Sequence, residues 1–133
     1  MGDEIRVPIT SDADIVIARQ QGRFLAERLG FAATDQTLIA TAISEVARNI
    51  IKFAKRGEVI LSPSSKSPLH GIVVTARDQG PGIADIQLAM LDGYSTGNGL
   101  GMGLPGCKRL MDELEIKSEE GKGTIVIMKK WVP

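Results

Sequence analysis

Glycine occupies every second position from residue 97 to residue 103, in the run Gly-Asn-Gly-Leu-Gly-Met-Gly-Leu. Such a run adds little to a core, but it can bring backbone N–H groups close to phosphate oxygens, because glycine reaches positive φ and has no side chain. Two further segments precede it, Glu45-Val-Ala-Arg-Asn49 and Asp78-Gln-Gly-Pro-Gly-Ile83. Together the three segments predict a nucleotide site, so the fold has to bring them together.

The length and charge of the chain limit the classes of protein to consider. A chain of 133 residues suits one domain, so residues 1–133 are expected to form a single unit. Sixteen basic side chains balance sixteen acidic ones, which argues against nucleic-acid binding. No apolar run approaches the length of a membrane span, the N-terminus has no apolar signal core, and a lone cysteine forms no internal disulfide. We therefore expect a cytoplasmic protein with no nucleic-acid or membrane partner.

Apolar spacing and turn residues predict the order strand, helix, helix, strand, strand, lid, helix, strand, strand. Strands are expected at 4–9, 58–62, 71–77, 114–118 and 124–131, and helices at 11–29, 34–55 and 104–111. Residues 63–68 have the composition of a solvated turn, and a glycine-rich lid covers about 84–103, with a possible short helix at 84–91. Short turns between neighbouring strands favour a mostly antiparallel sheet with helices on one face, an α+β two-layer sandwich.

The first polar segment lies on the second predicted helix. Glu45, Asn49 and Lys52 stand at i, i+4 and i+7 and therefore share one helical face. An amide oxygen can ligand Mg²⁺, a lysine can meet phosphate, and a carboxylate can accept a hydroxyl proton, so the trio suits phosphoryl transfer. Taken alone, a solvated face with an incidental ion pair is the simpler explanation. The apolar residues expected to face the core are Ile39, Ile43, Val46, Ile50 and Phe53.

Asp78 follows the predicted strand 71–77 and begins the second segment. Its carboxylate could accept a hydrogen bond from the exocyclic amine of adenine, while Gly80 and Gly82 would let a planar ring approach the backbone. A simple turn explains the same residues equally well when they are taken alone.

The glycine run matches neither of two common phosphate loops. Residues 101–108 lack the Gly-Lys-Ser/Thr ending of a Walker A loop, and the dinucleotide pattern fails at its third glycine. Backbone amides and the N-terminus of the predicted helix 104–111 remain as phosphate-binding groups. A flexible linker is the alternative.

Glu45-x-x-x-Asn49, Asp78-x-Gly-x-Gly82 and Gly97-x-Gly-Leu-Gly-x-Gly-Leu104 resemble the N, G1 and G2 boxes of the GHKL ATPase superfamily. The likeness covers nearly the whole chain. Residues 43–49 and 103–113 resemble the switch-protein serine/threonine kinases, and among these the RsbT-type kinases of bacterial stressosomes.

The resemblance implies a Bergerat-type ATP-binding fold that binds Mg²⁺ and ATP. It implies Glu45 as the general base, Asn49 on magnesium, Asp78 on adenine, and Thr124 supporting Asp78 through a hydroxyl or a water. The nucleotide-binding residues would be Asn49, Lys52, Asp78, Gly80, Gly82, Ile83, Gly97, Gly99, Leu100, Gly101, Met102, Gly103, Leu104 and Thr124. The family's substrates are serines or threonines of small STAS-domain scaffold proteins, and the released kinase activates a PP2C-type phosphatase.

The chain departs from some of these relatives in one respect. Anti-sigma-factor kinases place a lid arginine against the γ-phosphate, whereas no Lys or Arg occurs between Gly82 and Cys107 here. Arg48, Lys52, Lys108 or a residue of a partner are the candidates for this charge, and slow turnover without a partner would fit.

Three other functions compete with a kinase. In a nucleotide-gated binding module, ATP would only set the conformation that partners recognise. A histidine-kinase fragment needs a phosphoacceptor histidine on a dimerising helix, but His70 is expected in a turn. A fragment of a topoisomerase or chaperone ATPase fits least, because the transducer domain of those proteins is missing from the sequence.

Overall fold

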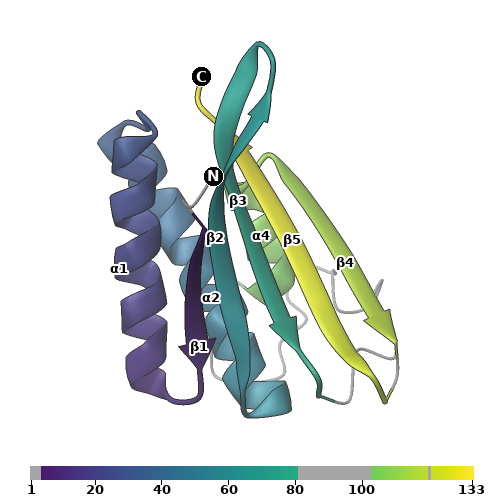
Figure 1. The fold of residues 1–133 in the computed structure, drawn as a ribbon. Coiled ribbons are helices and arrows are strands. Elements are labelled where there is room, and N and C mark those ends of the chain that lie inside the picture. The colour runs from purple at the N-terminus through teal and green to yellow at the C-terminus, as the bar shows by residue number, and fades with distance from the viewer. Residues whose placement is uncertain (1–3, 81–102, 120) are drawn as a thin grey trace.

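The chain folds in the predicted order of elements, as the computed structural model of residues 4–80, 103–119 and 121–133 shows (Figure 1). The predicted short helix at 84–91 and most of the predicted lid lie outside the described residues. The elements are β1 (Ile5–Ile9), α1 (Asp12–Arg28), α2 (Ala33–Ala54), β2 (Gly57–Lys66), β3 (Leu69–Asp78), α4 (Gly103–Leu110), β4 (Glu113–Glu119) and β5 (Gly123–Trp131).

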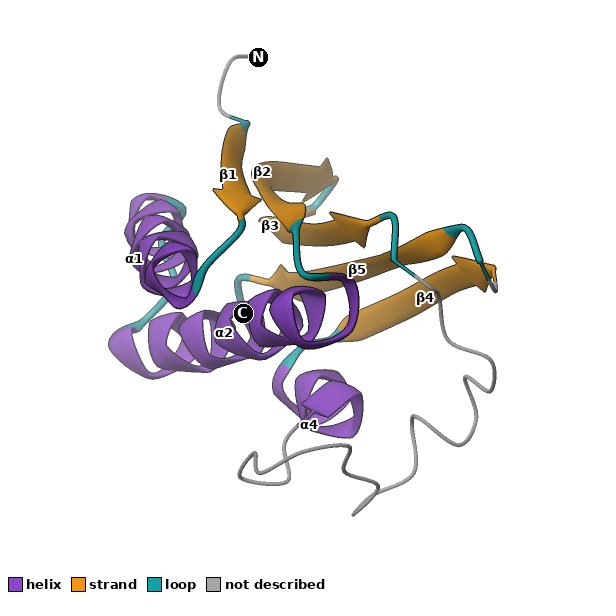
Figure 2. Cartoon of the chain, turned by 90° about the horizontal axis from the view of Figure 1, so that it is seen from below, coloured by secondary structure: helices purple, strands orange, loops and turns teal. Residues whose placement is uncertain are grey.

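The five strands form one open sheet in the order β1-β2-β3-β5-β4, and every neighbouring pair is antiparallel. The three labelled helices all lie on one face of this sheet (Figure 2). This arrangement confirms the predicted α+β sandwich with helices on one face. It also places β3 in the middle of the sheet, so the C-terminal end of β3 has a neighbouring strand on each side.

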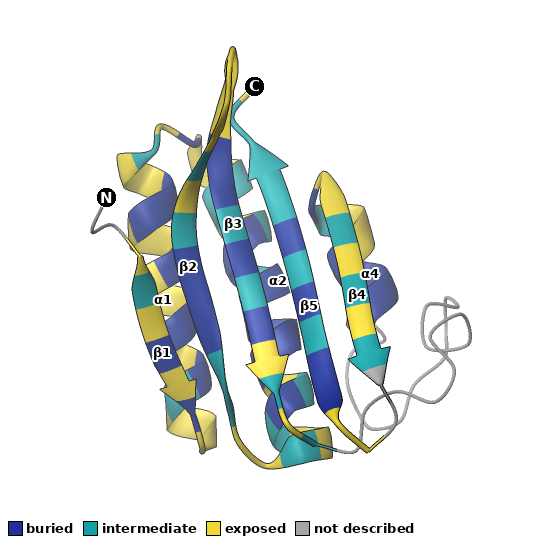
Figure 3. Cartoon of the chain, turned by 45° about the vertical axis from the view of Figure 1, so that its right-hand side comes forward, coloured by how far each residue is buried: buried dark blue, intermediate teal, exposed yellow. Residues whose placement is uncertain are grey.

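The core lies between the sheet and the helices. Alternate strand residues point inward, and Val59, Leu61, Val74 and Met128 are fully buried there (Figure 3). The helix residues buried opposite them include Ile39, Ile43, Val46 and Ile50 of α2, as their helical spacing predicts.

Phe53 does not belong to this core, so that prediction is wrong. Its exposed fraction is 46%, against 2% for Ile50. Three residues of an α-helix turn through about 300°, so Phe53 points roughly 60° away from the direction of Ile50. Because Phe53 is the penultimate residue of α2, this rotation is enough to leave the ring at the surface.

The hairpin of β2 and β3 is longer than predicted. Residues 63–66 continue β2, and Leu69 and His70 begin β3, so the expected solvated turn over 63–68 is wrong. The register pairs Lys66 with Leu69, which leaves only Ser67 and Pro68 between the strands. Polar composition misled the prediction, because this part of the hairpin extends beyond the other strands and its residues can be both paired and solvated (Figure 1).

Helix α1 begins and ends as its sequence predicts. The Asp14 carboxylate accepts hydrogen bonds from the backbone N–H groups of Thr10 and Ser11, at 2.9 and 3.2 Å. These bonds lower the pKa of Asp14, the Thr10 backbone bond most of all. Gly30 follows the helix at φ 96°, a conformation that suits glycine after a helix C-terminus.

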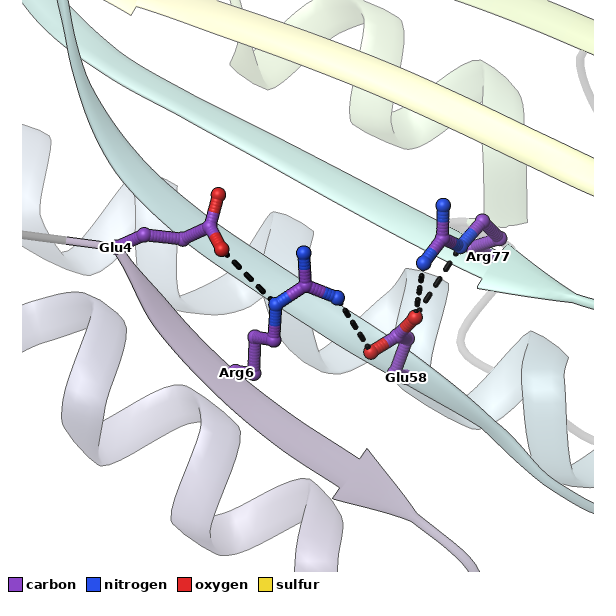
Figure 4. Close-up of polar contacts among 4 residues, drawn as sticks. All are labelled: Glu4, Arg6, Glu58 and Arg77. Atoms are coloured by element: carbon purple, nitrogen blue, oxygen red, sulfur yellow. Dashed lines mark hydrogen bonds and ion pairs between the residues drawn. The ribbon is translucent and has the colours of Figure 1, made fainter.

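The outer face of the sheet carries a chain of charged side chains across three strands. Arg6 contacts Glu4 and Glu58, and Arg77 contacts Glu58 from the other side (Figure 4). The two arginines lower the pKa of Glu58, and the hydrogen bonds from Arg77 are the largest cause. Charges in this position stabilise the pairing of β1, β2 and β3 on the face that the helices leave uncovered.

Candidate nucleotide site

Asp78 lies at the end of the central strand, in a row of residues that runs across the sheet. The register places Gly57 on one side of Asp78 and Thr124 on the other, with Ser118 beyond Thr124. Asp78 is half-buried, and its neighbour Ala76 points into the core. Because side chains alternate along a strand, Asp78 projects toward the helix layer rather than toward the open face.

The turn after β3 fixes the orientation of the Asp78 carboxylate. The backbone N–H of Gly80 donates a hydrogen bond of 2.9 Å to Oδ1, as in a common aspartate turn. The other oxygen, Oδ2, can accept from a ligand, since an ionised carboxylate accepts through both oxygens. This is the group that the sequence assigned to adenine.

Glycine allows this turn to lie against the last turn of α2. A Cβ on Gly80 would stand 2.5 Å from the Cβ of Ala54 and 3.2 Å from Oδ1 of Asp78. A Cβ on Gly57 would stand 2.9 Å from Ile50 and 3.1 Å from the Cβ of Asp78. The end of α2 and the end of β3 therefore pack against each other through two residues without side chains.

Gly123 approaches the same strand end from β5. Its φ of 115° favours glycine, and a Cβ there would overlap the backbone oxygen of Asp78. Gly80 is a predicted site residue, whereas Gly57 and Gly123 are not among the predicted ones. Gly57 pairs with Asp78, and Gly123 precedes Thr124, the partner of Asp78 on the other side. A glycine at the start of each of these strands was the available signal, because glycine in a strand often marks a close backbone approach.

Thr124 is buried next to Asp78, and its hydroxyl hydrogen bonds with the hydroxyl of Ser118 at 3.0 Å. The Ser118 hydroxyl also donates to the backbone oxygen of Gly123 at 3.2 Å. Thr124 pairs with Asp78 in the sheet register, as the expected link between them requires. The hydrogen bond described for the Thr124 hydroxyl, however, is with Ser118. Ser118 is a further polar residue of this row that the sequence analysis missed.

The α2 face carries Glu45, Asn49 and Lys52 as predicted, in three different environments. Glu45 has an exposed fraction of 9%, Asn49 is half-buried and Lys52 is exposed. The Nη1 of Arg48 lies 2.6 Å from the Oε1 of Glu45. The ammonium group of Lys52 lies over the ring of Phe53, 5.6 Å from its centre, which is a cation–π contact.

Helix α4 packs against α2 near the N-terminal end of this face. The Cys107 thiol is fully buried 3.6 Å from the backbone oxygen of Ala42, one turn before Glu45. Burial raises the pKa of Cys107 to about 12, and the charge of Glu45 adds to this rise. Leu104, also assigned to the nucleotide site, is buried in the core cluster at the start of α4.

A hollow of about 900 Å³ opens at the end of the sheet, with Asp78, Ser118 and Thr124 in its wall. It extends onto the open face of the sheet, where Glu58, Arg77 and Lys117 line it. Asp78, Thr124 and Ser118 therefore border a hollow at the strand ends that continues on the face opposite the helices. Glu45, Asn49 and Lys52 are not among the residues that line this hollow, so the hollow contains the Asp78 half of the predicted site alone.

The remaining predicted contacts are eight residues of the second and third segments. Seven of them lie outside the described residues: Gly82, Ile83, Gly97, Gly99, Leu100, Gly101 and Met102. Gly103 begins α4. In the described part of the chain, no three His, Cys, Asp or Glu side chains gather as metal ligands, and no helix is long and apolar enough to cross a membrane.

Comparison with known proteins identifies the class to which this arrangement belongs. Residues 34–133 match the family model of the histidine kinase-, DNA gyrase B- and HSP90-like ATPases. The chain belongs to this GHKL family, and within it to the protein serine/threonine kinases of the RsbT group.

Two relatives define this position within the family. The chain is 48% identical to the serine/threonine-protein kinase RsbT of Bacillus subtilis (strain 168) over 132 residues, 99% of each chain. It is 35% identical to the anti-sigma F factor of Thermoanaerobacter sp. (strain X514), over 71% of this chain and 68% of that protein.

A solved structure confirms the fold. A mycobacterial sensor histidine kinase, MprB, superposes with a TM-score of 0.58 at 20% identity, covering 98% of this chain and 99% of that one. At this identity the likeness concerns the fold alone.

Proposed function

We propose that this kinase uses Mg²⁺ and ATP to phosphorylate a serine or threonine of a small STAS-domain protein in a bacterial stress-signalling complex. In the same proposal, the kinase released from that complex binds and activates a PP2C-type phosphatase. It acts as a single domain in the cytoplasm. The observation that carries the proposal is the buried carboxylate of Glu45 one helical turn from Asn49, on a chain 48% identical to a serine/threonine kinase.

The two described halves of the site have different tasks in this proposal. Asp78 accepts a hydrogen bond from the adenine amine, and Thr124 and Ser118 complete the polar row beside it. On α2, Glu45 accepts the proton of the substrate hydroxyl and Asn49 supplies an amide oxygen to magnesium. ATP supplies the phosphoryl group.

The donor set on α2 fits magnesium held mainly by phosphates and water. Mg²⁺ in phosphoryl-transfer sites takes few protein ligands and keeps several waters. One neutral amide oxygen at Asn49 meets this pattern, and it adds no negative charge beside a triphosphate. The described residues offer no carboxylate cluster that would bind the ion without nucleotide.

Positive charge for the γ-phosphate has to come from outside residues 83–106, which contain no Lys or Arg. Lys52 can turn toward a phosphate if it leaves the Phe53 ring, at a cost of about 0.5–1 kcal/mol for an exposed cation–π contact. Lys108, exposed on α4, and Arg48, whose side chain is half-exposed on α2, are the other described candidates. A residue of the protein substrate would explain slow turnover in its absence.

A nucleotide-gated binding module is the second candidate. The 35% identity to an anti-sigma F factor favours it, because that name describes a protein that acts on a sigma factor. In such a module, Asp78 would still bind nucleotide, but the proton acceptor on α2 would have no reaction to serve.

Two conservative variants separate the candidates. We expect Glu45→Gln to lower phosphoryl transfer by at least 100-fold and to change ATP affinity by less than twofold, because the loss falls on proton transfer. We expect Asp78→Asn to weaken ATP binding at least tenfold, because the amide presents a donor or a weaker acceptor to the adenine amine. Both are measured with γ-labelled ATP, magnesium and a recombinant STAS-domain protein, with nucleotide affinity by titration of a fluorescent ATP analogue.

The stability of the label distinguishes the reaction types. An acid-stable label on the STAS-domain protein, lost in Glu45→Gln, supports serine or threonine transfer. An acid-labile label would indicate a phosphohistidine instead. Full transfer by Glu45→Gln would remove its assignment as the base, and tight ATP binding with no transfer would favour the binding module.

A further inference from the structure

Glu45 and Arg48 form an ion pair on the α2 face of the candidate site. The Arg48 Nη1 to Glu45 Oε1 distance is 2.6 Å, within one helix at i and i+3. The Arg48 side chain is 50% exposed, but that of Glu45 is only 12% exposed. Water and salt therefore screen this pair less than they screen an ion pair with two exposed members.

Helix geometry places Arg48 on one flank of the α2 face. Relative to Glu45, Asn49 is rotated by about 40° in one direction and Arg48 by about 60° in the other. Arg48 therefore reaches Glu45 from the solvent side without crossing the space in front of Asn49. Lys52, the other cation of this face, lies over the Phe53 ring. Of these two cations, the structure joins Arg48 alone to the carboxylate.

We infer that Arg48 is a positioning residue for Glu45, an inference that rests on the proposed function. A glutamate has three side-chain torsions, and a bond from Arg48 to Oε1 restricts them and leaves Oε2 as the proton acceptor. Glu45 takes the hydroxyl proton through Oε2 while the hydroxyl oxygen bonds to the γ-phosphorus and the bond from that phosphorus to ADP breaks. The proton then passes from Glu45 to solvent.

The inference predicts a specific pattern in the kinetics. We expect Arg48→Gln to lower the kcat of transfer to a recombinant STAS-domain protein by about 10- to 100-fold, since misplacing a reacting group by about 1 Å has effects of this size. The affinities for ATP and ADP should change by less than twofold. Arg48→Lys, which keeps a donor, should recover part of the loss, and Arg19→Gln on exposed α1 is the matched control with unchanged kcat.

A double variant separates positioning from a structural role. If Arg48 acts through Glu45, then Glu45→Gln with Arg48→Gln should be no slower than Glu45→Gln alone, because residues acting as a unit are not additive. A further loss in the double variant would refute the inference. The midpoint of urea unfolding is measured for each variant, so that lost activity is compared at equal folded fraction.

Three other results would overturn the inference. A weaker affinity of Arg48→Gln for ATP but not for ADP would place Arg48 on the γ-phosphate. An unchanged kcat would make the pair a surface contact, and a raised kcat would make Arg48 a restraint that has to leave before transfer. No transfer by the wild-type chain would refute the proposed function and the inference with it, whereas equal transfer by wild type and Arg48→Gln refutes the inference alone.

Discussion

The packing of the Asp78 turn against α2 predicts that one methyl group at Gly80 weakens nucleotide binding. Its Cβ would stand 2.5 Å from the Cβ and 2.9 Å from the Cα of Ala54, whereas apolar carbons pack at about 3.5–4.0 Å. The turn or the helix end has to move by about 1 Å. Such overpacking costs about 1–3 kcal/mol, so we expect the free energy of unfolding of Gly80→Ala to fall by this amount.

The same displacement carries the Asp78 carboxylate with it, because Gly80 N–H and Asp78 Oδ1 are hydrogen-bonded in this turn. A hydrogen bond to a charged group contributes about 1.5–3 kcal/mol, and each 1.4 kcal/mol changes an affinity tenfold. Loss of the proposed Asp78 contact to adenine would therefore weaken ATP binding by about 10- to 100-fold. Titration with a fluorescent ATP analogue measures this, alongside urea unfolding without nucleotide.

Ala54→Gly provides the matched partner for a double-mutant cycle. Alone, it removes a methyl group at the end of α2 and should cost about 0.5–1 kcal/mol of stability. Combined with Gly80→Ala, it removes the closest contact, so the double variant should regain at least about 1 kcal/mol relative to the sum of the two single losses. Additive losses in stability and ATP affinity would refute the proposed packing between α2 and the Asp78 turn.

Two further predictions use the titrating groups. Cys107 has a pKa of about 12 in place of about 9, so its thiolate fraction at pH 8 is roughly a thousandfold lower. Iodoacetamide, which reacts with the thiolate, should therefore label Cys107 only in denaturant. Rapid labelling of the folded chain would contradict the burial of this thiol. Because contacts with Arg77 lower the pKa of Glu58 from 4.5, the stabilisation is present above pH 4.5 and is lost as the pH falls through the lowered pKa. Glu58→Gln should therefore lower the free energy of unfolding by about 0.2–1 kcal/mol at pH 7 and by less at pH 3, as measured by urea unfolding. An equal loss at the two pH values would show that the charge of Glu58 is not the source of the stabilisation.

Local patterns in the sequence predicted the elements and their order. Alternation at 124–131, helical spacing through α2, and the short turns before β3 and β5 each reflect contacts between residues close in sequence. The same spacing predicted that Glu45, Asn49 and Lys52 share one face, which the structure confirms. The exposure of Phe53 was not predictable from spacing, because it depends on where the sheet stops covering α2.

Contacts between distant segments account for what the sequence analysis missed. Ser118 is next to Thr124 only because β4 and β5 pair in one register, and a shift of β4 by one residue would turn Ser118 to the open face. Gly57 and Gly123 likewise show their role only when β2 and β5 are placed beside Asp78. The Arg48 contact is local, but helical spacing allows several partners at i+3 and i+4 and does not select among them.

The two described halves of the site are joined by packing rather than by a direct polar link. Asp78 belongs to the sheet and Asn49 to α2, and the contacts that fix their separation are Gly80 against Ala54 and Gly57 beside Ile50. A close-packed interior transmits a displacement of one element to the other, because neither side has free volume to absorb it. If Asp78 and Asn49 have the proposed roles, substitutions in the last turn of α2 should therefore change ATP affinity without contacting the nucleotide, because this helix end sets the spacing of the two residues.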